Sequence, residues 1–251
     1  MLETAYAQGA QLTFLGSADH LCGLERALTG DPLSCTPFTC ARAVLEACAT
    51  GLWLLDPKID AKTRIERSLN YRLGSVRSQD RFRKKIELLG DEASQEWLSE
   101  TPAKATTDRI KHFRDTARQL GIRTRLNRNK KFLDFGSGMP KISERIEHAF
   151  RSEADYTILS LVAHSDQTGL VQFGGRVIQT DDGAALVPEL GASSAAWVTC
   201  DVVQWHSRAA WAHFWLLGRG LHQAQAVFEG VYDLLGLRPE LRFWRPHAGT
   251  T

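Results

Sequence analysis

Apolar residues recur at the spacing of an α-helix along most of the chain, so a mainly helical fold is the first prediction. Polar and glycine-containing stretches separate these amphipathic segments. None of them is rich enough in Pro, Gly and Ser to mark a linker between domains. The pattern predicts helices over 8–28, 37–57, 59–89, 104–120, 140–150, 156–170, 193–217 and 221–235.

The segment 37–57 is apolar around nearly its whole circumference, which indicates a central, buried helix. Two further segments contain turn signals, which are Asn127 to Asn129 in the first and two glycine turns in the second. The first, 122–136, alternates in part and predicts a β-hairpin, with a flexible basic loop as the alternative. The second, 170–188, predicts another hairpin or an excursion over the bundle.

Together these patterns predict one mainly α domain, a single helical bundle over 1–251 with about seven helices and one or two small β-hairpins. Within it, 58–136 is expected to form a basic helical insertion or lid. The last residues, 237–251, are expected to form an irregular tail.

A polar stripe interrupts two of the apolar segments. Tyr156, Ser160 and His164 are four residues apart, so they share one face of their helix. Arg42 and Glu46 have the same spacing on the central helix, where each charge needs a partner. We expect all five groups to meet. His164, Glu46 and Arg42 are then candidate catalytic residues, and Tyr156 and Ser160 candidate substrate-binding residues.

The alternative is a hydrogen-bonded core network that only specifies helix packing. Ser165 follows directly after His164 and is a third candidate for substrate binding. It belongs to the polar stretch SDQTGL, residues 165–170, whose more ordinary role is to cap a helix. A carboxylate next to a histidine would raise the pKa of that histidine and suit it to acid–base chemistry.

Charge is distributed unevenly along the chain. Residues 58–131 contain 20 Lys and Arg against 10 Asp and Glu, whereas the remaining residues contain 11 against 19. A basic segment of this kind can bind RNA or a nucleotide. A solvated helical face, balanced by the acidic remainder, is the alternative.

Several well-marked classes are excluded because their motifs are absent. The chain has no HExxH, GxGxxG, GxxxxGK[ST] or GxSxG motif and no CxxC pair among its five cysteines. We therefore expect no metal site, no cofactor and no structural disulfide. With no basic leader and no apolar run near the roughly 18 residues of a membrane span, we expect a cytoplasmic protein without a membrane partner.

Three sequence blocks, RAVLEACATGLWLLDP, MPKISERIEH and YTILSLVAHSDQTGL, resemble an uncharacterised helical family frequent in actinobacteria. The pattern is more distantly similar to HEPN domains, helical bundles of bacterial toxins and abortive-infection systems, many of which are metal-independent ribonucleases. Their motif is an arginine four to six residues before a histidine. This sequence departs from it, since Thr157, Ile158 and Leu159 are not arginine, so Arg42 or a residue of the basic segment would have to substitute.

These features lead to three hypotheses. The first is a helical module that binds a nucleotide, a nucleic acid or a partner protein in a bacterial defence or toxin–antitoxin system; a homo-oligomer is compatible with it. The second, implied by the resemblance, is a HEPN-like metal-independent ribonuclease using His164 with Arg42 and Glu46. The third is a small-molecule enzyme whose pocket is lined by the polar stripe and the Trp-rich helices near the end of the chain.

Overall fold

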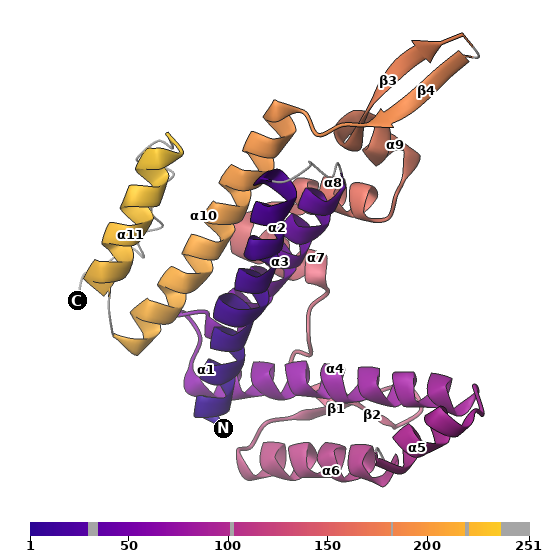
Figure 1. The fold of residues 1–251 in the computed structure, drawn as a ribbon. Coiled ribbons are helices and arrows are strands. Elements are labelled where there is room, and N and C mark those ends of the chain that lie inside the picture. Colours follow the sequence, from indigo (N-terminus) through magenta and orange to yellow (C-terminus); the bar gives the residue numbers. More distant parts are fainter. Residues whose placement is uncertain (30–34, 101–102, 182, 219–220, 237–251) are drawn as a thin grey trace. The chain divides into compact units, whose positions relative to one another are not determined.

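The computed structural model describes residues 1–29, 35–100, 103–181, 183–218 and 221–236. These residues are mainly α-helical with two separate antiparallel strand pairs, which confirms the predicted fold class (Figure 1). The predicted irregular tail, 237–251, lies outside the described residues.

The chain divides into two compact units. Unit 1 comprises Met1–Ala5 and Lys58–Pro140, and unit 2 comprises Tyr6–Pro57 and Lys141–Thr251. The predicted basic segment, 58–136, falls entirely within unit 1.

The core of unit 2 surrounds α3 (Thr36–Leu55), the predicted central helix. It packs against α2 (Ser17–Thr29), α7 (Ile142–Phe150), α8 (Glu153–Ala163) and α10 (Ala192–Leu217). Phe38, Leu45 and Leu54 of α3 are fully buried. By length and composition α3 is also the one helix among the described residues that could cross a membrane, and 61% of its apolar window is buried within the protein.

The N-terminal helix is longer and less regular than predicted. It consists of α1 (Leu2–Ala10), a π-helical segment η1 (Gln11–Gly16) and then α2. The chain passes from unit 1 to unit 2 within α1. The wide turn of η1 places buried Thr13 against Gly51 of α3, where an added Cβ would come within 2.7 Å of the threonine Oγ1. A glycine at this contact allows the two helices to approach closely.

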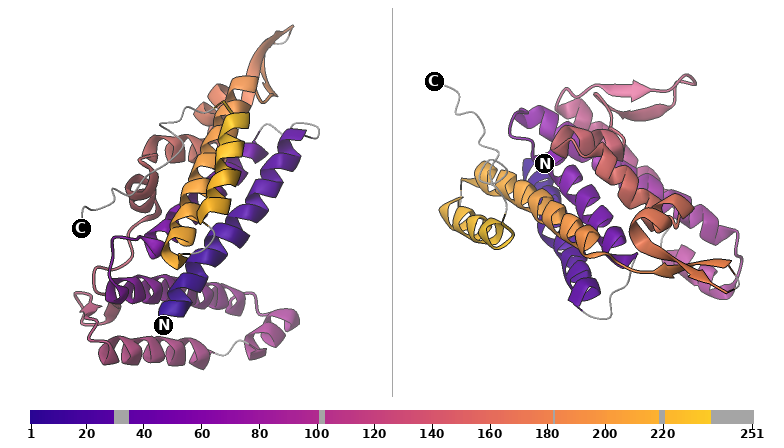
Figure 2. Two further views of the ribbon diagram at one scale, coloured as in Figure 1. Left: turned by 90° about the vertical axis from the view of Figure 1, so that its left-hand side faces the viewer. Right: turned by 90° about the horizontal axis from the view of Figure 1, so that it is seen from above.

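The remainder of unit 2 contains short helical turns, a hairpin and a last helix. The predicted helix over 156–170 is interrupted: α8 ends at Ala163, and α9 (Gln167–Gly169) follows, capped by Asp166, which accepts from the Thr168 amide at 2.9 Å. The π-helical η2 (Leu170–Gly174) occupies the start of the predicted hairpin. The strands are β3 (Gly175–Thr180) and β4 (Gly183–Pro188). The last helix, α11 (Leu221–Leu234), lies beside α10 in both views of Figure 2.

Unit 1 is built on α4 (Ala61–Glu87), whose first turn is capped by the Asp60 side chain accepting from the Thr63 amide at 2.7 Å. It continues with α5 (Glu92–Glu100), which the sequence did not predict, and α6 (Ala103–Gln119). Strands β1 (Thr124–Leu126) and β2 (Phe132–Phe135) form the predicted first hairpin. A small core closes between these elements; its buried members are Ile65, Leu69, Leu73, Val76, Phe113, Ala117, Ile122 and Phe135.

A buried asparagine joins α4 to the hairpin. The Nδ2 atom of Asn70 donates to the Phe135 carbonyl at 2.9 Å, and the Phe135 amide donates to the Asn70 Oδ1 at 3.0 Å. Asn70 is only 3% exposed. The Asn70 side chain therefore forms hydrogen bonds with both backbone groups of Phe135, which is buried away from solvent.

Candidate functional site

Arg42 and Glu46 lie on the edge of α3 that its neighbouring helices leave half exposed. The Nε atom of Arg42 donates to Glu46 Oε1 at 2.9 Å, and the side chains are 21% and 37% exposed, respectively. The prediction that Arg42 and Glu46 are buried in the core is wrong. Both groups are therefore partly accessible to water.

His164 follows α8 as its C-terminal cap residue and is exposed. Its Nε2 atom lies 2.8 Å from Nη1 of Arg42. A guanidinium group has only donors, so the imidazole nitrogen must accept. The contact therefore requires a neutral His164 with its proton on Nδ1.

Tyr156 completes the cluster from the first turn of α8. Its hydroxyl oxygen accepts from Nη2 of Arg42 at 3.4 Å, and the guanidinium carbon lies 5.4 Å from its ring centroid. Burial alone would lower the pKa of Arg42. The hydrogen bond and attraction to Glu46, together with Tyr156, outweigh this effect and raise that pKa above its ordinary value.

The order of contacts differs from the expected one. We expected Glu46 to orient His164 directly, but Arg42 lies between them and contacts both. No hydrogen bond joins Glu46 to His164 in the part of the chain that the structure describes. Arg42 is thus the centre of this Arg42 cluster, which consists of Arg42, Glu46, Tyr156 and His164.

The two serines do not join the cluster. The Ser160 hydroxyl is buried and has no hydrogen-bond partner among the described residues. Ser165 is exposed, adopts a left-handed backbone conformation with φ of 56°, and donates its amide to the Val162 carbonyl at 2.9 Å. The helix α8 has ended by this point, with His164 as its C-terminal cap residue.

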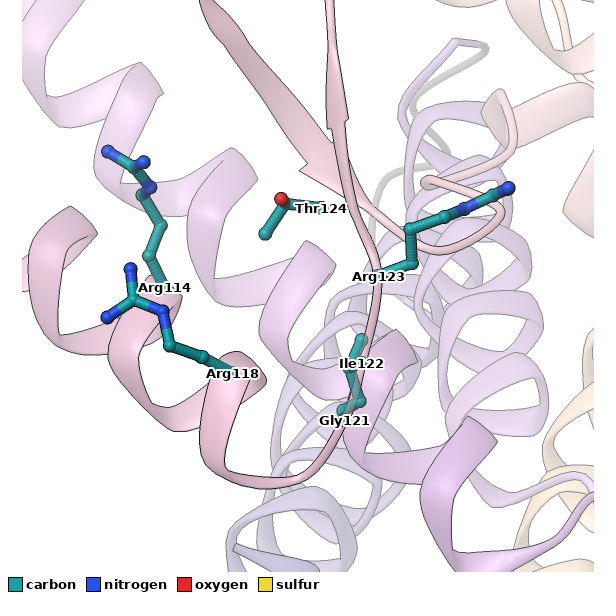
Figure 3. A pocket seen from close by; sticks show the side chains of 6 residues that line it. All are labelled: Arg114, Arg118, Gly121, Ile122, Arg123 and Thr124. Atoms are coloured by element: carbon teal, nitrogen blue, oxygen red, sulfur yellow. The ribbon is translucent and has the colours of Figure 1, made fainter.

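Unit 1 contains a second candidate site, which the sequence patterns did not predict. A pocket of about 370 Å³ lies between the C-terminal half of α6 and the segment that enters β1 (Figure 3). The residues that line it are Arg114, Arg118, Gly121, Ile122, Arg123 and Thr124. The charge count had marked the whole basic segment, but it could not single out these arginines.

The division into units separates the charges of the chain. Unit 1 has 20 Lys and Arg against 12 Asp and Glu, whereas unit 2 has 11 against 17. Several acidic groups of unit 1 are engaged locally. Asp60 and Asp91 accept from backbone amides, and Asp80 pairs with Arg83 and Lys84 on its own helix.

Consequently, many arginines of unit 1 have no carboxylate within ion-pair distance among the described residues. They include Arg72, Arg77, Arg109, Arg114 and Arg123. Burial lowers the pKa of Arg72 and of Arg77, and the charge of Arg109 lowers that of Arg72 further. Positive charge is therefore held in unit 1 at an energetic cost.

Aromatic rings hold several of these guanidinium groups in place. Arg72 lies over Phe113 with 4.5 Å from the guanidinium carbon to the ring centroid. Arg77 and Arg114 both lie over Phe132, at 5.6 and 5.5 Å. Such contacts fix the side chains without neutralising them.

Comparisons of the chain with protein-family models, curated proteins and solved structures give no match. The fold and the two sites define a mainly helical protein with an arginine-rich unit and a separate arginine–histidine cluster.

Proposed function

We propose that the protein binds single-stranded RNA through unit 1. The observation that carries this proposal is the group of arginines without carboxylate partners among the described residues, which includes Arg72, Arg77, Arg109, Arg114 and Arg123. Phosphate groups would supply the missing negative charges, and the release of their counterions drives such binding. Guanidinium groups fixed on rings lose little freedom when they bind phosphate.

An exposed aromatic side chain favours a single strand over a duplex. Phe82 of α4 is 54% exposed. Its ring meets Trp97 of α5 edge to face, with 5.5 Å between centroids, outside the core of unit 1. Unpaired bases stack on such rings beside basic side chains, whereas the bases of a duplex are already stacked.

The test is fluorescence anisotropy of a labelled single-stranded RNA of mixed sequence over a range of salt concentrations. Each neutralised phosphate lowers log K by about 0.7 per unit of log salt, so contacts by five arginines predict a slope of about −3.5. Duplex RNA and single-stranded DNA should bind more weakly. The proposal fails if RNA does not bind or binds with no dependence on salt.

A matched pair of variants locates the surface. Arg109→Gln removes an exposed arginine of unit 1 that donates only to Gln79, at 3.1 Å. Arg176→Gln removes an exposed arginine of unit 2 that is paired with Glu189 at 2.7 Å. Both change the net charge equally. Only Arg109→Gln should weaken RNA binding and reduce the salt slope by about 0.7; equal effects would rule out a surface confined to unit 1.

The Arg42 cluster supports a second function, metal-independent RNA cleavage. The observation that favours it is an exposed imidazole whose Nε2 atom lies 2.8 Å from Nη1 of an arginine that Glu46 also holds. Arg42 would transfer its Nη1 donor from His164 to a phosphate oxygen and thereby free Nε2 to act as a base. The chain resembles HEPN domains only distantly, and in this proposal Arg42 of α3 takes the place of the arginine that α8 lacks.

In the proposed step, Nε2 of His164 removes the proton of a ribose 2′-hydroxyl and the 2′-oxygen bonds the adjacent phosphorus. The bond from phosphorus to the 5′-oxygen breaks, and that oxygen takes a proton from water. The products are a 2′,3′-cyclic phosphate and a 5′-hydroxyl end. The charge on the phosphate oxygens increases in the transition state, where donation by Arg42 is strongest.

Cleavage of labelled RNA in the presence of a chelator tests this step. His164→Ala should abolish cleavage while retaining the melting temperature, since His164 is exposed. His148→Ala is the matched control, because His148 is also exposed and lies 3.6 Å from a carboxylate, Asp56. Absence of cleavage by the wild type, or equal cleavage by both variants, would exclude the ribonuclease function and leave RNA binding by unit 1 intact.

A further inference from the structure

The pocket in unit 1 has two arginines on one side and a hydroxyl opposite them. In Figure 3 the side chains of Arg114 and Arg118 extend from α6 next to each other, and that of Thr124 points toward them. The side chain of Arg123 extends to the other side of the chain, as expected of neighbouring residues at the start of a strand. Arg114 and Arg118 therefore line the pocket from α6 and Thr124 lines it from the strand side, whereas the Arg123 side chain extends away from them.

A lysine lies next to Gly121, one of the residues that line the pocket. Gly121 ends α6 with φ of +63°, and a Cβ built on it would lie 3.6 Å from Nζ of Lys62. The absence of a side chain at Gly121 leaves this ammonium group next to the pocket wall. Lys62 comes from the first turn of α4, so the two long helices of unit 1 both contribute cations.

Two carboxylates among the described residues interact with these cations, Asp60 and Asp115. The pKa of Asp60 is lowered mainly by the hydrogen bonds from Thr63 and also by the charge of Lys62. Asp115 accepts from Nη1 of Arg118 at 3.2 Å, and both side chains are largely exposed, at 43% and 75%. An exposed pair of this kind contributes little and exchanges readily. Arg114 has no carboxylate partner in the described part of the chain and is held over Phe132. The pocket therefore keeps a net positive charge.

The helix dipole explains part of this arrangement. A basic residue in the last turn of a helix, such as Arg118, stabilises that turn. Arg114 is one turn further from the helix end, and Lys62 belongs to another helix, so neither has this explanation. Their presence at the same pocket points to a ligand that carries more than one negative charge.

We infer that this pocket binds a phosphate monoester, namely the terminal phosphate of an RNA strand or the phosphate of a mononucleotide. A monoester carries a charge of about −1.5 to −2 and three free oxygens, whereas an internal diester carries −1 and two free oxygens. Two arginines, a lysine and a hydroxyl match the monoester. The pocket volume lies within the range of about 300–1,000 Å³ that small ligands occupy.

The inference deepens the proposed RNA binding and rests on it for the RNA ligand. When the end of an RNA strand is bound in the pocket, the rest of that strand would contact the arginines of unit 1, which include Arg72 and Arg109. The pocket would then select strands by their end, while the rest of the surface would bind any sequence.

The experiment compares one RNA sequence with a 5′-phosphate, a 3′-phosphate or hydroxyl groups at both ends, by competition against a labelled strand. The wild type should prefer one phosphorylated end by about tenfold, the value expected for new charge-assisted hydrogen bonds. Arg114→Gln combined with Arg118→Gln should abolish this preference. Arg109→Gln should weaken all three RNAs and retain the preference, because Arg109 is not among the residues that line the pocket.

Adenosine monophosphate and inorganic phosphate distinguish the two sources of the monoester. If both compete with the phosphorylated strand in the wild type but not in the double variant, the pocket takes the free group as well. Equal binding of all three RNAs, with no competition by either small molecule, would overturn the inference and leave RNA binding intact. Binding of the nucleotide without any RNA binding would overturn the proposed function and retain the pocket.

Discussion

The two units differ in how they accommodate their surplus charge. In unit 2, where acids are in excess, Asp201 of α10 faces Asp155 of α8, and burial together with this repulsion raises the pKa of Asp201 to about 6. In unit 1, where bases are in excess, Arg72 faces Arg109 in the same way. A carboxylate can take up a proton near neutral pH, but a guanidinium group cannot lose one. The charge of unit 1 is permanent, so it favours an anionic partner.

The arginines show the same contrast. Arg42 of unit 2 is bound by Glu46, His164 and Tyr156, and its charge is matched within the protein. Arg72 and Arg114 of unit 1 contact aromatic rings and no described carboxylate. An arginine of the first kind should stabilise its unit. Arginines of the second kind should contribute to binding and little to stability.

The largest effect is expected from breaking the join between α4 and β2 in unit 1. Asn70→Ala removes both hydrogen bonds to Phe135 and leaves two buried backbone groups without partners. We expect a loss of about 3 kcal/mol in the stability of unit 1, at roughly 1–3 kcal/mol for each group. Hydrogen exchange, resolved by peptide, should be faster over 61–136. RNA binding, measured by fluorescence anisotropy, should be weaker.

Asn129→Ala is the control for this variant, since Asn129 is exposed in the hairpin turn and only its backbone amide is bonded there. It should leave exchange unchanged. Normal protection in Asn70→Ala would show that β1 and β2 do not depend on this contact.

The next effect concerns the Arg42 cluster. Arg42→Ala removes the group that joins α3 to α8 and should cost about 1 kcal/mol, as expected for partly exposed charged hydrogen bonds. Arg114→Ala, which breaks no ion pair among the described residues, should cost less. Denaturant unfolding of the two variants gives this comparison directly.

Nitrogen NMR of the His164 ring adds an independent measurement. The wild type should show the tautomer with the proton on Nδ1, and Arg42→Ala should lose this fixed tautomer because its cause is the Arg42 donor. The same tautomer in both proteins would mean that Arg42 does not control the imidazole.

The cluster and the pocket show what could be predicted from the sequence. The spacing of Arg42 with Glu46 and of Tyr156 with His164 placed each pair on one helix face, because helix geometry is local. The position of Arg42 between Glu46 and His164 depends on how α3 packs against α8, and no local pattern contains that information. The exposure of the cluster was missed for the same reason.

The arginine pocket could not be predicted for a different reason. Arg114 and Arg118 are two of 20 basic residues in the segment 58–131, and their composition does not distinguish them. What distinguishes them is the absence of a strong carboxylate partner and the return of the chain at Gly121, both of which are tertiary features. The π-helical turn at Thr13 likewise has no sequence signal that we can identify.

A change in stability of about the same size as that of Arg42→Ala is expected at the acidic pair of unit 2, Asp155 and Asp201. Below about pH 4 Asp201 is protonated in both the folded and the unfolded chain. Between about pH 4 and 6 only the folded state keeps the proton, so stability falls as the pH rises through this window. Above about pH 6 Asp201 is charged in the folded state too, and the full free-energy cost of burying that charge remains. A shift of about two pH units would correspond to roughly 3 kcal/mol, which partial exposure reduces to about 1 kcal/mol.

Asp201→Asn should therefore raise the stability by about 1 kcal/mol at pH 7 and leave it unchanged at pH 3.5. Thermal unfolding at the two pH values measures this difference. Glu147→Gln, at an exposed position of α7, is the control and should change neither value. A gain of the same size at both pH values would show that ionisation of Asp201 is not the cause.

The smallest change in stability is expected for a substitution at Arg72, which tests whether the arginines of unit 1 without described carboxylate partners contribute to its stability. Arg72→Met keeps an unbranched side chain over Phe113 while removing the repulsion from Arg109 and the cost of burying a charge. The lost cation–π contact offsets part of this gain, at about 0.5–1 kcal/mol. We expect the stability of unit 1 to change by less than about 0.5 kcal/mol, with the more favourable value at low salt, where repulsion is unscreened. RNA affinity should nevertheless fall.

A double-mutant cycle isolates the repulsion between the two arginines. If Arg72 and Arg109 repel each other, the benefit of Arg72→Met at low salt should disappear when Arg109→Met is already present. Additive effects would mean that the two charges do not interact. A large loss of stability in Arg72→Met would place Arg72 with Arg42 among the structural arginines, and the contrast between the units would then not extend to this residue.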